Sequence, residues 1–341
     1  MRVLVTGHRG FIGSVMVPLL LGEGHEVVGL DTDYYRDCTF AGPLPDVPSI
    51  DRDIRDAQPA DVAGFDAVVH LAALSNDPLG DLDPALTFEV NHLATVRLAR
   101  LARDAGASRF LFSSSCSNYG AAGDRLLDED AEFHPVTAYG ESKVRAECDL
   151  LELATDGFSP VLLRSATAYG ISPRLRCDIV LNNLTAYAVA TGRALIKSDG
   201  TPWRPIVHVE DICRAFAAAL RAPRSAVHKQ AFNVARPEEN YRVRELAEIV
   251  RDTVPGTAIQ FAGDASPDAR NYRVDASKIA RTLPHFHPTW KAREGARQIY
   301  EAFRKVGITV DDFEGWRYRR IGQMKRLLGS GLLGPDLRWR R

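Results

Sequence analysis

Three glycines spaced three residues apart follow the first apolar run of the chain. The run is Arg2-Val3-Leu4-Val5-Thr6, and the glycines are Gly7, Gly10 and Gly13. A strand that turns sharply into a helix needs residues without a Cβ, because the backbone must bend tightly and approach its neighbours closely. The N-terminus of such a helix presents N–H groups that bind phosphate. The spacing is G-x-x-G-x-x-G and not the usual G-x-G-x-x-G, but its position between strand and helix predicts a dinucleotide site.

The first half of the chain alternates apolar runs with helical patterns. Near-continuous apolar strands that alternate with helices are typical of a parallel sheet covered on both faces. Right-handed crossovers then give a doubly wound α/β fold, the Rossmann fold, whose ligand lies outside the carboxyl ends of the strands. We expect strands at Val3–Thr6, Glu26–Leu30, Ala67–Leu71, Arg109–Ser113 and Val161–Arg164, and helices at Ile12–Leu21, Pro84–Ala105 and Ala138–Thr155.

The regular alternation weakens after about Arg164, where Pro, Gly and Arg become more frequent. We therefore predict two parts. Residues 1–165, together with about 206–235, form the dinucleotide-binding Rossmann domain. Residues from about 166–205 and 236–341 form a smaller α/β substrate-binding lobe and a C-terminal tail.

Composition gives no reason to expect a nucleic-acid or membrane partner, because the 341 residues carry a net charge of −1. The segment 315–341 holds eight Lys or Arg residues and one acidic residue, but without a nucleic-acid motif it predicts a solvated helix and tail. Five cysteines without C-x-x-C spacing predict reduced thiols, no metal site and a cytoplasmic location. The first strand leaves no room for a signal peptide, and no apolar run approaches the roughly 18 residues that span a bilayer.

Asp31 ends the second predicted strand, eighteen residues beyond Gly13. A carboxylate at this position bonds the ribose hydroxyls of a dinucleotide and repels a 2′-phosphate, so it favours NAD over NADP. Arg9 and Arg36 weaken this preference, because their charge would suit a phosphate.

Tyr139 and Lys143 lie four residues apart in a predicted helix, so their side chains share one face. A tyrosine with its ordinary pKa of about 10 is a poor base at neutral pH. A neighbouring ammonium group lowers this pKa and makes the phenol a general base toward an alcohol. A serine-rich strand end, Ser113-Ser114-Ser115, precedes the pair and supplies a hydroxyl group for the same site.

These features together resemble the extended short-chain dehydrogenase/reductases, specifically the NAD-dependent nucleotide-sugar epimerase/dehydratase family and its UDP-galactose and UDP-glucuronate 4-epimerase-like members. The resemblance runs from Arg2 to about Val234. The residues that carry it are the glycine turn, Asp31, Asp53-Ile54, His70-Leu71-Ala72-Ala73, Asn91, Ser115, Tyr119-Gly120, Tyr139, Lys143 and the segment Gly200–Asp211.

The resemblance implies roles for individual residues. The implied NAD-binding residues are Gly7, Gly10, Phe11, Ile12 and Gly13 at the pyrophosphate, Asp31 at the ribose, Asp53 and Ile54 at the adenine, Leu71, Ala72 and Ala73 along the groove, and Asn91, Ser113, Tyr139 and Lys143. The implied substrate is a nucleotide-diphosphate sugar, and its expected contacts are Ser75, Ser115, Ser117, Thr167, Asn182 or Asn183, and Arg204. The guanidinium of Arg204 would bind the diphosphate, because its planar fork matches phosphate oxygens.

The residues after Ser115 favour one reaction of the family. All members oxidise a sugar hydroxyl, usually at C4, with Tyr139 as base and Ser115 bonded to the same oxygen. Dehydratases of the family then use an Asp-Glu pair directly after this serine, and decarboxylases use a Glu at the second position. Here the two positions are Cys116 and Ser117. We therefore expect an NAD-dependent 4-epimerase, which needs only reversible hydride transfer.

Three alternatives stay open. The first is an NAD(P)-dependent reductase or dehydrogenase of a keto nucleotide sugar. The second is a dehydratase that uses the Cys116 thiol as a catalytic acid or base, and the third is a non-catalytic dinucleotide-sensing protein. Thr167 and Ile171 replace the Asn and Pro of the family pattern, which suggests a modified sugar.

The resemblance also implies a homodimer formed by the helices at Pro84–Ala105 and Ala138–Thr155. An apolar seam on the first helix would serve this contact, although the same residues could instead face the sheet. The seam residues are Leu93, Val96, Leu98 and Leu101.

Overall fold

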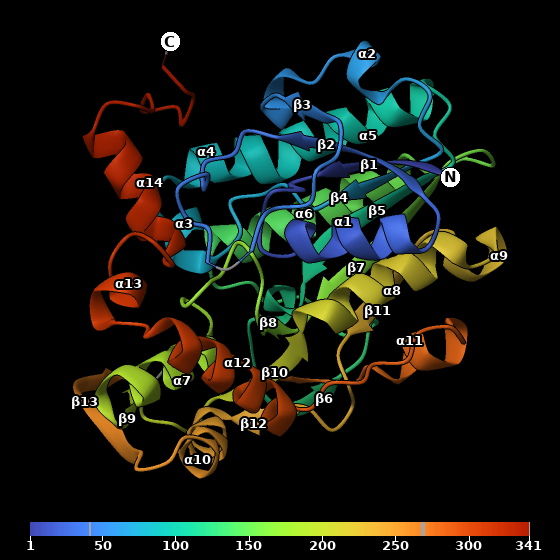
Figure 1. The fold of residues 1–341 in the computed structure, drawn as a ribbon. Coiled ribbons are helices and arrows are strands. Elements are labelled where there is room, and N and C mark those ends of the chain that lie inside the picture. The colour runs from blue at the N-terminus through green and yellow to red at the C-terminus, as the bar shows by residue number, and fades with distance from the viewer. Residues whose placement is uncertain (41, 267–269, 341) are drawn as a thin grey trace.

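A seven-stranded parallel sheet forms the centre of the computed structural model, which describes residues 1–40, 42–266 and 270–340 (Figure 1). Its strands are β1 (Arg2–Thr6), β2 (Glu26–Asp31), β3 (Ser49–Asp51), β4 (Ala67–His70), β5 (Arg109–Ser115), β7 (Ser159–Ser165) and β11 (Gln230–Val234). They follow the order β11-β7-β5-β4-β1-β2-β3. Val5 of β1 pairs with Gly29 of β2 on one side and Val69 of β4 on the other. The order therefore reverses beside β1, where a doubly wound sheet opens a ligand crevice, and the predicted fold class is confirmed.

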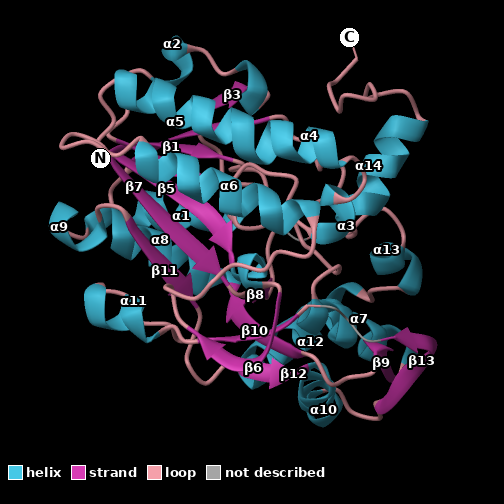
Figure 2. Cartoon of the chain, turned by 180° about the vertical axis from the view of Figure 1, so that it is seen from behind, coloured by secondary structure: helices cyan, strands magenta, loops and turns pink. Residues whose placement is uncertain are grey.

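Helices cover both faces of this sheet, which explains why its central strands are apolar along their whole length. One face packs against α1 (Gly13–Gly22) and α8 (Val209–Arg221). The other face packs against α5 (Ala94–Asp104) and α6 (Ala138–Glu152), as the opposite views in Figures 1 and 2 show.

The expected helix at Pro84–Ala105 is interrupted. It consists of α4 (Pro84–Phe88), a π-helical turn at Glu89–Leu93, and α5. Such a turn changes the direction in which side chains point, and it often marks a functional position. Here it carries Asn91, whose side chain bonds both backbone groups of Leu74, the N–H at 2.8 Å and the carbonyl at 3.0 Å.

A second lobe packs below the carboxyl edge of the sheet (Figure 1). Its core contains α7, α10, α12 and the paired strands β9 and β13. Their bounds are α7 (Val180–Thr191), β9 (Arg193–Ser198), α10 (Val243–Thr253), β13 (Ala258–Ser266) and α12 (Ala292–Val306), followed by α13 (Val310–Glu314). Small sheets join the two parts, and their strands are β8 (Thr167–Tyr169), β10 (Trp203–His208) and β12 (Asn240–Arg242) in one, and β6 (Ala121–Leu127) and β14 (Asn271–Val274) in the other. The remaining short helices are α2 (Pro59–Val62), α3 (Asp77–Gly80), α9 (Arg224–Val227) and α11 (Ser277–Thr282).

The division between the lobes differs from the sequence prediction at the C-terminal end. The predicted second lobe included all of 236–341, but α11 packs against β11 of the large sheet. The helix α14 (Arg320–Gly329) lies beside α3 on the Rossmann domain (Figures 1 and 2). The side chains of Met324 and Leu327 are buried there, so the prediction of a solvated helix and tail is wrong. The basic residues of α14 misled the prediction, because the helix also buries Met324 and Leu327, and even Arg320 is buried.

The predicted dimer seam does not form a surface. The side chains of Val96 and Leu98 are buried against the sheet, and Leu101 is partly buried in the same core. Leu93 is exposed, at 59% of its possible area. The period of the helix turns three of the four residues inward, so the homodimer stays a prediction without this seam.

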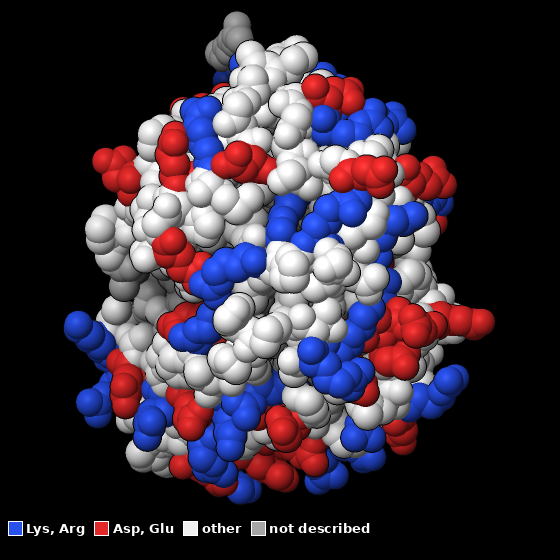
Figure 3. Space-filling model, turned by 90° about the vertical axis from the view of Figure 1, so that its right-hand side faces the viewer, with Lys and Arg blue, Asp and Glu red and all other residues white. Residues whose placement is uncertain are grey.

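Charged residues of both signs are interspersed over the surface in Figure 3, in line with the net charge of −1. Among the residues that the structure describes, no helix is long and apolar enough to cross a membrane. The described cysteines are free thiols.

A buried ion pair joins α6 to the sheet. Arg164 on β7 donates to the Glu147 carboxylate at 2.7 and 3.0 Å, and both side chains are almost fully buried. Glu147 also accepts hydrogen bonds from Ser114 and Asn118, while Arg164 donates to the Tyr119 hydroxyl at 3.1 Å. Each charge is therefore neutralised within the core, as a buried ion requires.

Removal of one partner of the Arg164–Glu147 ion pair should lower the stability of the fold. Arg164→Met is expected to lower the free energy of unfolding by about 3–5 kcal/mol, because it leaves Glu147 charged and buried. The double variant Arg164→Met/Glu147→Gln should recover part of this loss. The matched control is Arg145→Met, which removes an exposed partner of Glu141 on the same helix and should change stability by less than about 1 kcal/mol. Urea denaturation measures all three, and equal losses for Arg164→Met and Arg145→Met would contradict the assignment.

Candidate active site

The turn between β1 and α1 has no room for a side chain at Gly7 or Gly13. Gly7 has a φ of +73°, and a Cβ on it would lie 2.7 Å from the backbone nitrogen of Ala72. A Cβ on Gly13 would lie 2.2 Å from the carbonyl oxygen of Gly7. The turn is closed by a hydrogen bond from the Gly10 N–H to the Gly7 carbonyl at 2.9 Å. This tight cradle ends at the N-terminus of α1, so it fits the pyrophosphate of a dinucleotide.

Asp31 holds this turn from the end of β2. Its carboxylate accepts hydrogen bonds from the backbone N–H groups of Arg9 at 2.9 Å and Asp33 at 2.8 Å. Burial raises the pKa of Asp31, while these two hydrogen bonds oppose the shift. Asp31 thus positions the glycine turn as well as facing the cavity where a ribose would bind.

A cavity of about 610 Å³ runs along the carboxyl edge of the sheet from this turn to the second lobe. It brings together most of the residues that the sequence predicted. Those that line it are Gly7, Gly10, Phe11, Ile12, Gly13, Asp31, Asp53, Ile54, Leu71, Ala72, Ala73, Ser75, Ser113, Ser115, Ser117, Tyr139, Lys143, Thr167 and Arg204. Residues from distant parts of the chain, from Gly7 to Arg204, therefore line one cavity.

Helix α6 presents Tyr139 and Lys143 to this cavity. Thr137 caps the helix by accepting the N–H of Gly140 at 3.1 Å. The Lys143 ammonium donates to the Ser113 carbonyl at 2.8 Å, and burial lowers its pKa to about 7. Burial, together with the charge of Asp77, raises the pKa of Tyr139 to about 12, and a hydrogen bond with Ser115 acts in the opposite direction.

The Lys143 ammonium is bound to the strand end, at the side of the Tyr139 ring. Its nitrogen lies 5.8 Å from the centre of the Tyr139 ring and closer, at 4.5 Å, to the ring of Phe112. The carbonyl of Ser113 draws the ammonium toward the strand end. The pair lies on one helix face, as predicted, but the lysine is held by the sheet.

Cys116 does not reach the cavity, so the predicted catalytic role of its thiol is wrong. Its side chain is fully buried, and its sulfur donates to the carbonyl of Arg164 at 3.1 Å. Burial raises the pKa of this thiol well above its usual value. Ser115 and Ser117, its neighbours in the chain, line the cavity, while the 3-10 turn that begins at Cys116 directs the thiol into the core.

Three asparagines that the sequence placed at ligands also lie outside the cavity lining. Asn182 is fully buried and bonds the backbone of Gly170 and Arg176. Asn183 donates to the carbonyl of Cys177 at 2.9 Å. Asn91 orders the loop after β4 through Leu74, which agrees with the ordering role the resemblance implied but places it behind the cofactor groove.

The sequence prediction missed five charged residues and a tyrosine at the substrate end of the cavity. They are Asp77, Arg176, Asp178, Arg270, Tyr272 and Arg320. They form pairs, with Arg270 bound to Asp77 at 2.5 Å and Arg176 bound to Asp178 at 2.8 Å. No motif marks them, because they come from helices, loops and a strand that are distant in the sequence and meet only in the folded chain.

The arrangement places a hydroxyl, a phenol and an ammonium group beside a dinucleotide cradle. Such a site can remove the proton of an alcohol while a hydride leaves the carbon that carries the hydroxyl group. Among the described residues, no group of three His, Cys, Asp or Glu side chains is placed to hold a metal ion. The buried arginines at the other end of the cavity suit an anionic substrate.

Known proteins are similar to this chain in sequence and in fold. The model of the NAD-dependent epimerase/dehydratase family matches residues 3–235. UDP-glucose 4-epimerase of Mycolicibacterium smegmatis is 31% identical over 322 residues, which cover 89% of this chain and 99% of that protein. UDP-glucuronic acid decarboxylase 1 of Arabidopsis thaliana is 26% identical over 324 residues, which cover 92% of this chain and 72% of that protein.

Among solved structures, MoeE5 in complex with UDP-glucuronic acid and NAD is similar over 90% of this chain and 100% of its own, with 28% identity and a TM-score of 0.77. The likeness extends over both lobes, and it agrees with the dinucleotide cradle and the Tyr139–Lys143 face described above. The chain belongs to the NAD-dependent epimerase/dehydratase family, and NAD is its cofactor.

Proposed function

We propose that this enzyme is a nucleotide-sugar 4-epimerase. The observation that carries the proposal is the environment of Ser115. Ser115 and Tyr139 line the cavity together, but the next residue, Cys116, faces the core and the one after it, Ser117, is a hydroxyl. By resemblance to the family, a dehydratase or a decarboxylase would carry a carboxylate at position 116 or 117. Epimerisation needs no group there.

In the proposed reaction, NAD supplies the acceptor for the hydride from C4 of the sugar. Tyr139 as the phenolate takes the proton of the C4 hydroxyl, and Ser115 bonds the same oxygen. Because burial raises the pKa of Tyr139 to about 12, the positive charge of Lys143 is needed nearby to favour the phenolate. After the keto sugar turns over, the hydride would return to C4 on its opposite face, and Tyr139 gives its proton back to the C4 oxygen, which restores the phenolate.

The substrate end supports a sugar joined to a diphosphate. Arg204 is buried and lines the cavity beside Arg176 and Arg270. A guanidinium group can donate two parallel hydrogen bonds to two oxygens of one phosphate, and burial strengthens this interaction. The relatives named above act on or bind UDP-sugars, which makes UDP-hexoses and UDP-hexuronates the first substrates to test.

Three other reactions have less support. A dehydratase that uses Cys116 would need this thiol to reach the sugar, but the thiol is buried. A decarboxylase has a relative at 26% identity, but Ser117 cannot act as a carboxylate. No contact at the site favours a net reduction or oxidation.

Purified enzyme is expected to interconvert one pair of C4-epimeric UDP-sugars. Incubation with UDP-glucose, UDP-galactose and the matching uronates, followed by proton NMR, identifies the pair. Absorbance of the reduced nicotinamide should show no lasting gain, because the hydride returns to the sugar. A product that has lost water or carbon dioxide, or stoichiometric reduced cofactor, would overturn the proposal.

Tyr139→Phe removes the proposed base but keeps the ring. The turnover number should fall by roughly 10²–10⁴-fold, the usual contribution of a positioned base. NAD content should stay at the wild-type level, because the cradle is unchanged. The matched control is Tyr300→Phe, a tyrosine on α12 outside the cavity lining, which should turn over at the wild-type rate. Wild-type turnover by Tyr139→Phe would exclude the mechanism.

Lys143 should make stability depend on pH. Its pKa in the folded enzyme is about 7, whereas an unfolded lysine has a pKa of about 10.4. Between these pH values the unfolded chain binds more protons, so the stability of the wild type should rise with pH. Relative to Lys143→Met, the rise should be about 2 kcal/mol from pH 7 to pH 9.

Urea denaturation of both proteins at the two pH values, without sugar nucleotide, measures this difference. Lys143→Arg serves as control, because it keeps its charge throughout this range. Identical pH dependence for the wild type and Lys143→Met would contradict a buried lysine with a lowered pKa.

A further inference from the structure

The C-terminal end of the chain lies against the strand end where the adenosine ribose is expected. We call Leu333–Arg340 the C-terminal clasp. Within it, Trp339 donates from its indole nitrogen to the Thr32 carbonyl at 2.7 Å, and the Leu337 carbonyl accepts from the Tyr34 hydroxyl at 2.6 Å. Both partners follow Asp31 directly, so the clasp is fixed to the end of β2.

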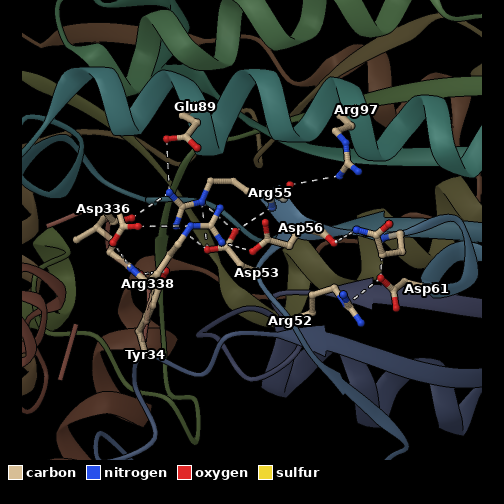
Figure 4. A network of polar contacts seen from close by, with 12 residues as sticks. Tyr34, Arg52, Asp53, Arg55, Asp56, Asp61, Glu89, Arg97, Asp336 and Arg338 are labelled. Carbon is tan, nitrogen blue, oxygen red and sulfur yellow. Dashed lines mark hydrogen bonds and ion pairs between the residues drawn. The ribbon is translucent and has the colours of Figure 1, made fainter. Parts of the chain in front are cut away.

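A second group of contacts fixes the clasp to the segment after β3 (Figure 4). Arg338 forms an ion pair with Asp56, and Arg55 donates to the Asp336 carbonyl at 2.9 Å. Arg55 also binds Asp53 at 2.7 Å. Asp53 is a predicted adenine neighbour, so the clasp spans the two sides of the adenosine position.

The clasp forms a wall of a second cavity of about 610 Å³. Leu337, Arg338 and Trp339 line it from the clasp. The residues that it shares with the main cavity are Arg9, Asp31, Thr32, Asp33, Tyr34, Arg52 and Asp53. The second cavity therefore continues the cofactor groove at its adenosine end.

Charge indicates which part of a dinucleotide suits this space. The second cavity is lined by five aspartates and four arginines. Arg9 is paired with Asp51 at 2.7 Å, and Arg52 with Asp61 at 2.9 Å. A phosphate group would have to displace these carboxylates, whereas ribose hydroxyls and an adenine ring bring no charge. The lining thus fits an unphosphorylated adenosine.

The inner side of the clasp is apolar and anchored. Leu333 and Leu337 are buried in the core that includes α14, and Leu333 forms a β-bridge with Trp339. The Arg36 guanidinium lies 3.9 Å from the centre of the Trp339 ring. The clasp is thus an ordered part of the fold at this end of the cofactor groove, and a dinucleotide bound in the second cavity would lie against it.

We propose that the C-terminal clasp is part of the NAD site, where it encloses the adenosine half and slows release of the cofactor. The clasp contacts the adenosine end of the groove, far along the cavity from Tyr139. It should therefore act on affinity for any ligand that contains this adenosine. The inference depends on NAD as cofactor and not on which sugar reaction the enzyme catalyses.

Trp339→Ala removes the ring and the hydrogen bond to Thr32. We expect the dissociation constant for NAD to rise about tenfold or more by isothermal titration, a change of about 1.4 kcal/mol or more. The affinity for ADP-ribose should fall to the same extent, because ADP-ribose contains the adenosine half. The affinity for nicotinamide mononucleotide should not change.

The matched control is Trp316→Ala. Trp316 precedes α14, lies 4.1 Å from the Arg326 guanidinium, and lines neither cavity. It tests loss of a tryptophan from the same segment, and its variant should bind NAD like the wild type. Equal NAD affinity of the Trp339→Ala and Trp316→Ala variants would overturn the proposal.

Hydrogen exchange of the wild type gives a test that does not depend on a variant's folding. Backbone amides of the clasp should exchange more slowly when NAD is added, and also with ADP-ribose. UDP-glucose alone should leave them unchanged. If NAD does not slow the exchange of the clasp amides, the proposal is overturned, even if Trp339→Ala fails to fold. Because these measurements follow cofactor binding, they succeed or fail independently of the epimerase reaction.

Discussion

The position of the proposed catalytic face depends on one buried ion pair, Glu147 with Arg164. Tyr139, Lys143 and Glu147 follow one another at intervals of four residues, so they share one face of α6. The Glu147 carboxylate bonds Arg164 on β7 and Ser114 on β5, which fixes the rotation of the helix against two neighbouring strands. The next residue on β5 is Ser115. The same pair therefore determines how the phenol of Tyr139 meets this hydroxyl.

This ion pair also contributes to the electrostatics of the site. Burial lowers the pKa of Lys143, while the negative charge of Glu147, one turn further along the helix, opposes the shift. The Glu147 carboxylate is not an isolated charge in the core, because the Arg164 guanidinium forms an ion pair with it at 2.7 Å. Stability and function are thus linked: the charges that hold α6 in place also keep a proton available beside Tyr139.

The sequence predicted those parts of the enzyme that depend on neighbours in the chain. The glycine turn, the apolar strands and the Tyr139–Lys143 face are local patterns, and the sheet and cavity confirm their arrangement. The errors concern side-chain direction and distant contacts. Cys116 follows Ser115 but faces the opposite way, and Asn182 turns its amide to the backbone of Gly170. Arg270 and Asp77 meet across 193 positions, which no local pattern indicates.

The C-terminal clasp and the proposed epimerase reaction support each other. A dehydrogenase must exchange its cofactor in every cycle, so a wall that slows release would limit its turnover. An epimerase returns the hydride to the sugar, so its cofactor can remain bound while many substrates pass. The proposed contacts of the sugar nucleotide, Arg204 and Arg270, line one end of the cavity, and the clasp contacts at Thr32 and Asp56 lie at the other. Substrate exchange can therefore proceed without opening the clasp, which is the arrangement that a retained cofactor requires.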